Sequence, residues 1–159
     1  MRAFYDHTAR PLWAYLVRIS GDRDLADDLL QESYCRFLSA QLPEMNQAES
    51  KNYLFRIATN LMSDRWRQNK WVTTVDEVEQ ATENHLEART QVRQAFQRLK
   101  PRERQLLWLA YVEGLSHGEI AGITGLRAAS IRLLLFRARR RLAEVLRIYG
   151  RLPKEKLRI

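Results

Sequence analysis

Apolar residues recur at helical spacing along most of the chain, and hardly any stretch alternates between apolar and polar residues as a strand would. The first such run spans roughly residues 5–19 and is followed by Gly21, a residue that often ends a helix. Further helices are predicted at about 24–39, 50–69, from 91 towards Lys100, and over 102–113. The pattern therefore predicts an all-α fold.

Residues 116–142 are predicted to form a helix-turn-helix. Ser116 can cap the first helix, and Glu119 three residues later can reach back to the Ser116 N–H, which together make a capping box. Gly125 supplies the positive φ angle that a short connection between helices needs. After this turn, the residues expected on the buried side are Leu126, Ile131 and Leu135.

The charge of the chain is concentrated at its C-terminal end. The net charge is +8, but residues 127–159 carry eleven Lys and Arg against two Asp and Glu, whereas residues 76–90 carry one against five. A positive charge gathered behind a helix-turn-helix is typical of a nucleic-acid contact. The arginines left for solvent or phosphate are Arg127, Arg132, Arg137, Arg139, Arg140 and Arg141.

A chain of 159 residues has room for two small domains. We expect an N-terminal helical domain over 1–72, an acidic linker over 73–90, a helix-turn-helix domain over 91–150 and a basic tail over 151–159. Small domains of this kind leave little room for a deep catalytic cleft.

Nothing in the sequence favours an enzyme or a cofactor. His7, His85 and His117 lack metal-ligand spacing, and Cys35, the single cysteine, completes no ligand set and forms no internal disulfide. There is no phosphate-binding glycine loop, membrane-spanning run or signal-peptide core. We therefore expect a cytoplasmic protein with no metal, no small-molecule substrate and no membrane insertion.

The predicted helix at 24–39 has a polar, mostly acidic stripe. Its members are Asp24, Asp28, Gln31, Glu32 and Cys35, and the opposite side carries Leu29, Ser33 and Phe37. A negative stripe suits a protein partner better than DNA, although a plain solvated face gives the same pattern.

The predicted helix at 50–69 carries side-by-side stripes. Its apolar stripe, expected to face the core, contains Leu54, Ile57, Ala58 and Leu61. Beside it, a polar and basic stripe contains Arg56, Asn60, Ser63 and Arg67, and a third contains Phe55, Thr59, Met62 and Trp66. Interleaved cations and aromatic rings suit single-stranded DNA, with Trp66 and Trp71 as candidate stacking residues. The alternative is that Phe55 and Trp66 belong to the core.

Taken in order, three segments resemble the extracytoplasmic-function (ECF) group of bacterial RNA polymerase sigma factors. They are GDRDLADDLLQESYCRFL at 21–38, NYLFRIATNLMSDRWR at 52–67, and the stretch from LKPRERQLL to FRARRRL at 99–142. The first two resemble sigma region 2 and the last resembles region 4, so the resemblance implies a subunit that gives the polymerase its promoter specificity.

The resemblance also implies partners and site residues. Asp28, Gln31 and Glu32 match the surface that docks on the coiled coil of the polymerase β′ subunit, and the β flap and an anti-sigma protein are further expected partners. The candidates for the single-stranded −10 element are Arg56, Asn60, Ser63, Asp64, Trp66 and Arg67. The candidates for the −35 duplex are Arg127, Ser130, Arg132, Phe136, Arg137, Arg139 and Arg140.

The sequence departs from the family in two places. The stretch 40–50 contains no aromatic residue, which leaves the pocket for a flipped −10 base undefined, and Leu133 and Leu134 stand where polar and basic residues are usual. Two other interpretations stay open on sequence alone. The chain could be a stand-alone helix-turn-helix regulator, or a sigma-like protein-interaction module that has lost DNA reading.

Overall fold

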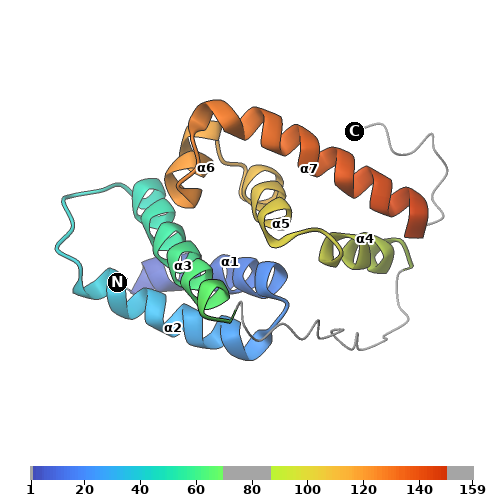
Figure 1. Ribbon diagram of the computed structural model, residues 1–159. Coiled ribbons are helices and arrows are strands. Elements are labelled where there is room, and N and C mark those ends of the chain that lie inside the picture. Colours follow the sequence, from blue (N-terminus) through green and yellow to red (C-terminus); the bar gives the residue numbers. More distant parts are fainter. Residues whose placement is uncertain (1, 70–86, 150–159) are drawn as a thin grey trace.

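The computed structural model describes residues 2–69 and 87–149, which form helices and no strands, as predicted (Figure 1). The N-terminal helices are α1 (Arg2–Ser20), α2 (Arg23–Ser39) and α3 (Gln47–Asn69). The C-terminal helices are α4 (Glu87–Gln97), α5 (Pro101–Leu107), the π-helical η1 (Trp108–Val112), α6 (His117–Thr124) and α7 (Ala128–Tyr149).

The N-terminal helices pack pairwise against one another. The chain turns between α1 and α2 at Gly21, whose φ of 71° is easily reached only by glycine, and the Asp22 carboxylate then accepts a hydrogen bond from the Leu25 N–H. Helical periodicity directs one stripe of each helix inward. The side chains buried between them include Leu12, Leu16, Ile19, Ala26, Leu29, Leu54, Ala58 and Met62.

The C-terminal helices gather around α7, which contacts α4, α5 and α6 and runs along the upper edge of Figure 1. The predicted helix 102–113 is not one regular helix. It changes at Trp108 to a π-helix, in which the Glu113 N–H donates to the Trp108 carbonyl five residues earlier. Gly114 follows with a φ of 66° and turns the chain towards α6.

The two helical groups are in contact: α3 lies beside α6, and α1 lies beside α5. Across the boundary, the Gln105 amide donates to the Tyr15 hydroxyl (3.0 Å), and that hydroxyl shares a 2.8 Å hydrogen bond with Thr59. Lys51 forms an ion pair of 2.9 Å with Glu113, and the Asn52 amide donates to Glu119 (2.7 Å). Buried and half-buried side chains of α1 and α3 are therefore covered by the C-terminal helices.

Some predicted boundaries need correction. The helix α3 begins at Gln47 rather than about 50, because the Asn46 side chain accepts a hydrogen bond from the Glu49 N–H and so starts the helix early. The helix α4 begins at Glu87, inside the predicted linker 73–90. Residues 70–86, which carry most of that acidic stretch together with Trp71, and the tail 151–159 lie outside the described residues.

Candidate functional site

The helix-turn-helix has the geometry that its sequence predicts. The Ser116 hydroxyl accepts a hydrogen bond from the Glu119 N–H (3.2 Å), and the Glu119 carboxylate accepts one from the Ser116 N–H (3.1 Å). Gly125 ends α6 in the left-handed conformation, with φ 75°. Hydrogen bonds from the Ser116 backbone and then from Asn52 hold the pKa of the Glu119 carboxyl below its usual range. The negative charge of Glu119 thus stabilises the N-terminus of α6.

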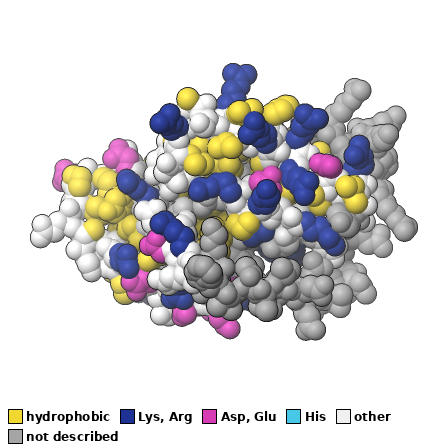
Figure 2. Space-filling model, viewed as in Figure 1, with side chains coloured by type: hydrophobic (Ala, Val, Ile, Leu, Met, Phe, Trp, Pro, Cys, Tyr) yellow, Lys and Arg dark blue, Asp and Glu magenta, His cyan; other side chains and the backbone are white. Residues whose placement is uncertain are grey.

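The helix α7 has one buried and one exposed side. Ile131, Leu135 and Ala138 are buried against the neighbouring helices. The exposed side is rich in arginine, and Figure 2 shows Lys and Arg side chains spread along this helix with hydrophobic side chains between them. The exposed arginines in this part of the chain are Arg127, Arg132, Arg137, Arg139, Arg140, Arg141 and Arg147.

The sequence-predicted −35 candidates do not all lie on the same side of α7. Arg139 donates a hydrogen bond of 2.6 Å to the Tyr111 hydroxyl, so it lies towards η1. Ser130 is half-buried, and its N–H donates to the Arg127 carbonyl in the first turn of the helix. Arg132 and Arg137 are exposed and have no hydrogen-bond or ion-pair partner among the described residues.

The polar stripe of α3 is exposed. Arg56, Asn60, Asp64 and Arg67 face solvent, and the Asp64 carboxylate lies 3.4 Å from the Arg67 guanidinium. Ser63 is half-buried. The structure therefore brings Arg56, Asn60 and Arg67 together on one accessible side of α3, while Asp64 also lines the groove between α2 and α3.

The aromatic stripe of α3 is mostly core, in agreement with the alternative interpretation of the sequence. Phe55, Thr59 and Met62 are buried, and the Phe55 ring lies 5.3 Å from the ring of Tyr15. Trp66 is half-buried and packs against the core. An unpaired base therefore cannot stack on Phe55, but it can reach the exposed part of Trp66.

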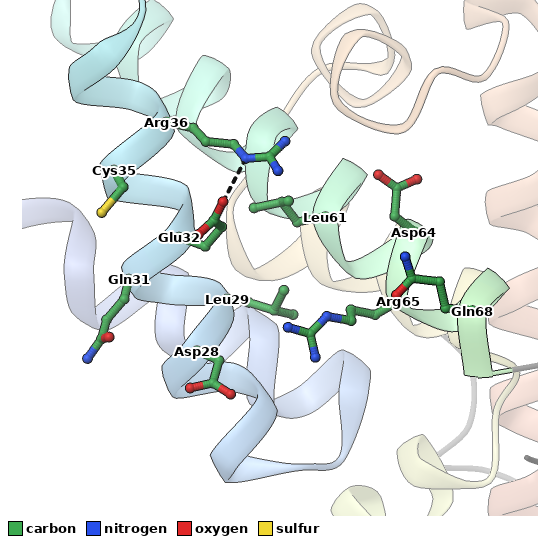
Figure 3. A pocket seen from close by; sticks show the side chains of 10 residues that line it. All are labelled: Asp28, Leu29, Gln31, Glu32, Cys35, Arg36, Leu61, Asp64, Arg65 and Gln68. Atoms are coloured by element: carbon green, nitrogen blue, oxygen red, sulfur yellow. Dashed lines mark hydrogen bonds and ion pairs between the residues drawn. The ribbon is translucent and has the colours of Figure 1, made fainter.

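The α2 stripe (Asp28, Gln31, Glu32 and Cys35) is exposed along one wall of a polar groove between α2 and α3. Leu29 and Leu61 lie at its base, while Arg36 and Arg65 extend into it from opposite helices (Figure 3). Glu32 is paired with Arg36 at 3.0 Å, but both side chains are more than half exposed, so this pair adds little stability. Most of the stripe remains accessible to a partner.

A second, apolar groove of about 1360 Å³ lies between α4, η1 and α7. Tyr111 and Val112 on its wall are more than half exposed. Its margin is basic, with Arg18, Arg93, Arg139 and Arg140, and the −35 candidate Phe136 also lines it. The sequence analysis missed this groove, although a signal was present: residues 106–112 are all apolar, which is more than a one-sided helix needs.

Neither a metal site nor a membrane span is found in the described part of the chain. Residues 2–69 and 87–149 contain no group of His, Cys, Asp and Glu side chains able to hold a metal ion. None of the helices in those ranges is long and apolar enough to cross a membrane.

Comparison with known families identifies the class of protein. The Sigma-70 region 2 family matches residues 4–72, which hold α1 to α3, and the Sigma-70, region 4 family matches residues 89–142, which include the helix-turn-helix. The chain therefore belongs to the sigma-70 family of bacterial RNA polymerase sigma factors. Members of this family are DNA-binding regulators rather than enzymes.

Individual relatives place the chain in the ECF group. It is 29% identical over 162 residues to the ECF RNA polymerase sigma factor SigL of Mycobacterium tuberculosis, covering 94% of this chain and 90% of SigL. It is 26% identical to the ECF sigma factor SigM of Bacillus subtilis, covering 87% and 90%. Its fold is similar to that of sigma factor RpoE of Bartonella quintana, solved with the anti-sigma factor NepR (TM-score 0.66, 22% identity, 92% and 96% covered). The chain is a promoter-directing sigma factor.

Proposed function

We propose that the helix-turn-helix binds the −35 promoter element as duplex DNA, with α7 as the recognition helix. The observation that carries this proposal is the exposed, arginine-rich side of α7 directly after the turn at Gly125. Arg132, Phe136 and Arg137 contact base edges, where arginine pairs with guanine and an apolar side chain covers a thymine methyl. Arg127, Ser130, Arg139 and Arg140 contact phosphates, which orient the helix without reading sequence.

The exposed stripe of α3 binds the −10 element once its strands separate. Arg56 and Arg67 neutralise phosphates, while Asn60 and Asp64 offer hydrogen-bonding groups to an unpaired base. Ser63 and Trp66 border the same side. Holding one base outside the stack offsets part of its unstacking cost, which is a few kcal/mol.

The polymerase core binds both domains. Its β′ coiled coil docks on Asp28, Gln31 and Glu32, whose exposure beside a polar groove supports a protein contact. Its β flap docks against the η1 side of the apolar groove, because exposed Tyr111 and Val112 form the kind of apolar surface that soluble proteins usually cover. Phe136, Arg139 and Arg140 line the α7 side of this groove and are left to the DNA.

We also propose an anti-sigma partner and the domain limits. The structural neighbour RpoE is solved with an anti-sigma factor, which supports a partner of that kind for this chain. The region 2 domain spans 1–72 and the region 4 domain reaches 150. Because α4 starts at Glu87, the connecting segment is shorter than the 73–90 expected from charge alone.

In-vitro transcription tests this function. Purified core polymerase and the full chain are incubated with a library of promoters, with core polymerase alone as the control. We expect transcripts that start at defined positions downstream of shared −35 and −10 elements. Transcripts that do not depend on the chain would refute the proposal.

A further inference from the structure

The outward side of α7 carries a line of apolar side chains in its first turns. Ala129, Leu133 and Phe136 are spaced four and three residues apart, which places them along one line of the helix. All three are exposed, Leu133 by 51% and Phe136 by 49%. We call these residues the apolar line. Ala129 and Leu133 lie opposite the buried side of the helix, whereas Phe136 also lines the apolar groove between α4, η1 and α7.

The two leucines that depart from the family pattern, Leu133 and Leu134, differ in burial. Leu134 is half-buried and packs against the core, so its apolar character is explained by folding. Leu133 points outward and contributes little to packing. A large, exposed aliphatic side chain on the arginine-rich side of the helix needs another explanation.

Arginines border the apolar line on both sides. Arg132 is one turn from Phe136, Arg137 is one turn from Leu133, and Arg140 continues the line itself. These three arginines are exposed and have no hydrogen-bond or ion-pair partner among the described residues. The nearest exposed carboxylate on α7, Glu144, lies one turn beyond Arg140 and 3.8 Å from Arg141, so the border around Leu133 and Phe136 itself is cationic. Such a border matches a polyanion better than it matches an ordinary protein surface.

The apolar group that duplex DNA offers in its major groove is the C5 methyl of thymine. A leucine side chain cannot donate a hydrogen bond to a base edge, but it can bury that methyl group. Of the bordering arginines, Arg132 and Arg137 would reach base edges beside that methyl group, and Arg140 would meet a phosphate. In this arrangement the apolar and the basic side chains on the outward side of α7 contact the DNA together.

We propose that Leu133 is a specificity-determining residue that reads a thymine of the −35 element through its C5 methyl group. This inference rests on the proposed function of α7. It predicts that the preferred −35 element contains a thymine whose methyl group, rather than its hydrogen-bonding edge, is required.

The test compares thymine with uracil, which lacks only the methyl group. Holoenzyme made from the full chain and core polymerase first selects duplexes from a library randomised upstream of the −10 element. Each thymine of the selected −35 element is then replaced by deoxyuridine, one at a time, and binding is measured by competition. The variants are Leu133→Ser and, as a matched control, Ile148→Ser, because Ile148 is also exposed on α7 but lies far from the apolar line.

We expect deoxyuridine at the position read by Leu133 to weaken binding of the parent holoenzyme about fourfold, the factor that follows from burying one methyl group. A thymine covered by Phe136 would be a second sensitive position, and Leu133→Ser should leave the ratio there unchanged. At the position read by Leu133, Leu133→Ser should bind the thymine and deoxyuridine duplexes equally. Ile148→Ser should keep the fourfold ratio at that position.

The possible failures are distinct. If no upstream element is selected, α7 does not read duplex DNA, and the proposed function and this inference both fall. If an element is selected but every deoxyuridine is tolerated, only the methyl reading is wrong. If Leu133→Ser keeps the parent ratio, another residue contacts the methyl group and the assignment to Leu133 is refuted.

Discussion

The guanidinium of Arg104 in α5 donates a hydrogen bond from Nη2 to the carbonyl oxygen of Ile19 at the end of α1, 2.5 Å away. Its Nη1 donates to the carbonyl of Leu99 (2.6 Å). Arg104 is buried, and desolvation lowers the pKa of its guanidinium. One side chain thus joins the C-terminus of α1 to the start of the C-terminal helices.

Replacing Arg104 should weaken this connection. Arg104→Ala leaves buried carbonyl groups without donors, so we expect the free energy of unfolding to fall by about 1–3 kcal/mol. Urea denaturation of the full chain measures the change. The control is Arg147→Ala, an exposed arginine of α7, which should change stability by no more than about 0.5 kcal/mol. Equal midpoints for both variants would contradict the prediction.

Tyr15 should make the chain sensitive to alkaline pH. Burial raises the pKa of its hydroxyl from 10.0 to about 12 in the folded state, against smaller opposing effects of Thr59 and Gln105. Below about pH 10 the hydroxyl is protonated in both states, so it adds no pH dependence. Above that pH the unfolded state loses the proton first, and the free energy of unfolding falls until about pH 12, by up to about 3 kcal/mol.

Tyr15→Phe should remove this contribution. The variant should be less stable than the parent at neutral pH, because Thr59 and Gln105 lose a buried partner. Its stability should then decline less steeply between about pH 10 and 12. Denaturation curves at several pH values would measure both effects. Identical slopes would show that Tyr15 does not titrate in this way.

The α2 stripe should determine polymerase binding without affecting the fold. Asp28→Ala combined with Gln31→Ala should weaken capture by core polymerase, since the changed side chains are exposed and should alter stability by no more than about 0.5 kcal/mol each. Asp6→Ala, an exposed acidic residue of α1, is the control. Undiminished capture of the double variant would refute the assignment of this surface.

Asn60 should act in promoter opening. In holoenzyme complexes, Asn60→Ala should reduce the reactivity of −10 thymines to permanganate while closed-complex footprints persist. The reason is that Asn60 offers its amide to an unpaired base and is not needed by the fold, because it is exposed on α3. Gln94→Ala, an exposed amide of α4, should open promoters like the parent. If the Asn60 variant opens promoters normally, the assignment of Asn60 to the −10 site is refuted.

Two glycines of the helix-turn-helix should respond oppositely to alanine. Gly125 has φ 75° and open space around its missing Cβ, so Gly125→Ala should cost about 1–2 kcal/mol through backbone strain alone. Gly122 lies within α6, also with open space, so Gly122→Ala should stabilise by about 0.5–1 kcal/mol. Thermal denaturation of both variants provides the comparison. If both variants changed the thermal stability in the same direction, the positive φ angle would not explain why glycine is needed at position 125.

Local signals in the sequence predicted much of the fold. The spacing of Leu54, Ala58 and Leu61 identified the inner side of α3, and the positions of Ser116 and Glu119 fixed the start of α6. These features depend on neighbours within one or two turns. For that reason a single sequence is enough to predict them.

Contacts between distant segments could not be predicted in this way. Arg104 and Gln105 have the sequence character of a solvent-exposed helix side, yet their partners Ile19 and Tyr15 lie 85 and 90 residues away. Phe55 could equally be a core residue or a stacking residue until the position of Tyr15 was known. The π-helical turn at Trp108 likewise left no clear sign in the apolar run that contains it.

Cys35 has a practical consequence. It is the single cysteine of the chain, it is exposed, and it lies in the groove beside Asp28 and Glu32. A maleimide fluorophore or a photocrosslinker can therefore be attached at one defined point of the unmodified sequence, without first removing other thiols. A probe placed there sits at the surface proposed for the polymerase and would report docking directly, by a change in emission or by a covalent product whose partner can be sequenced.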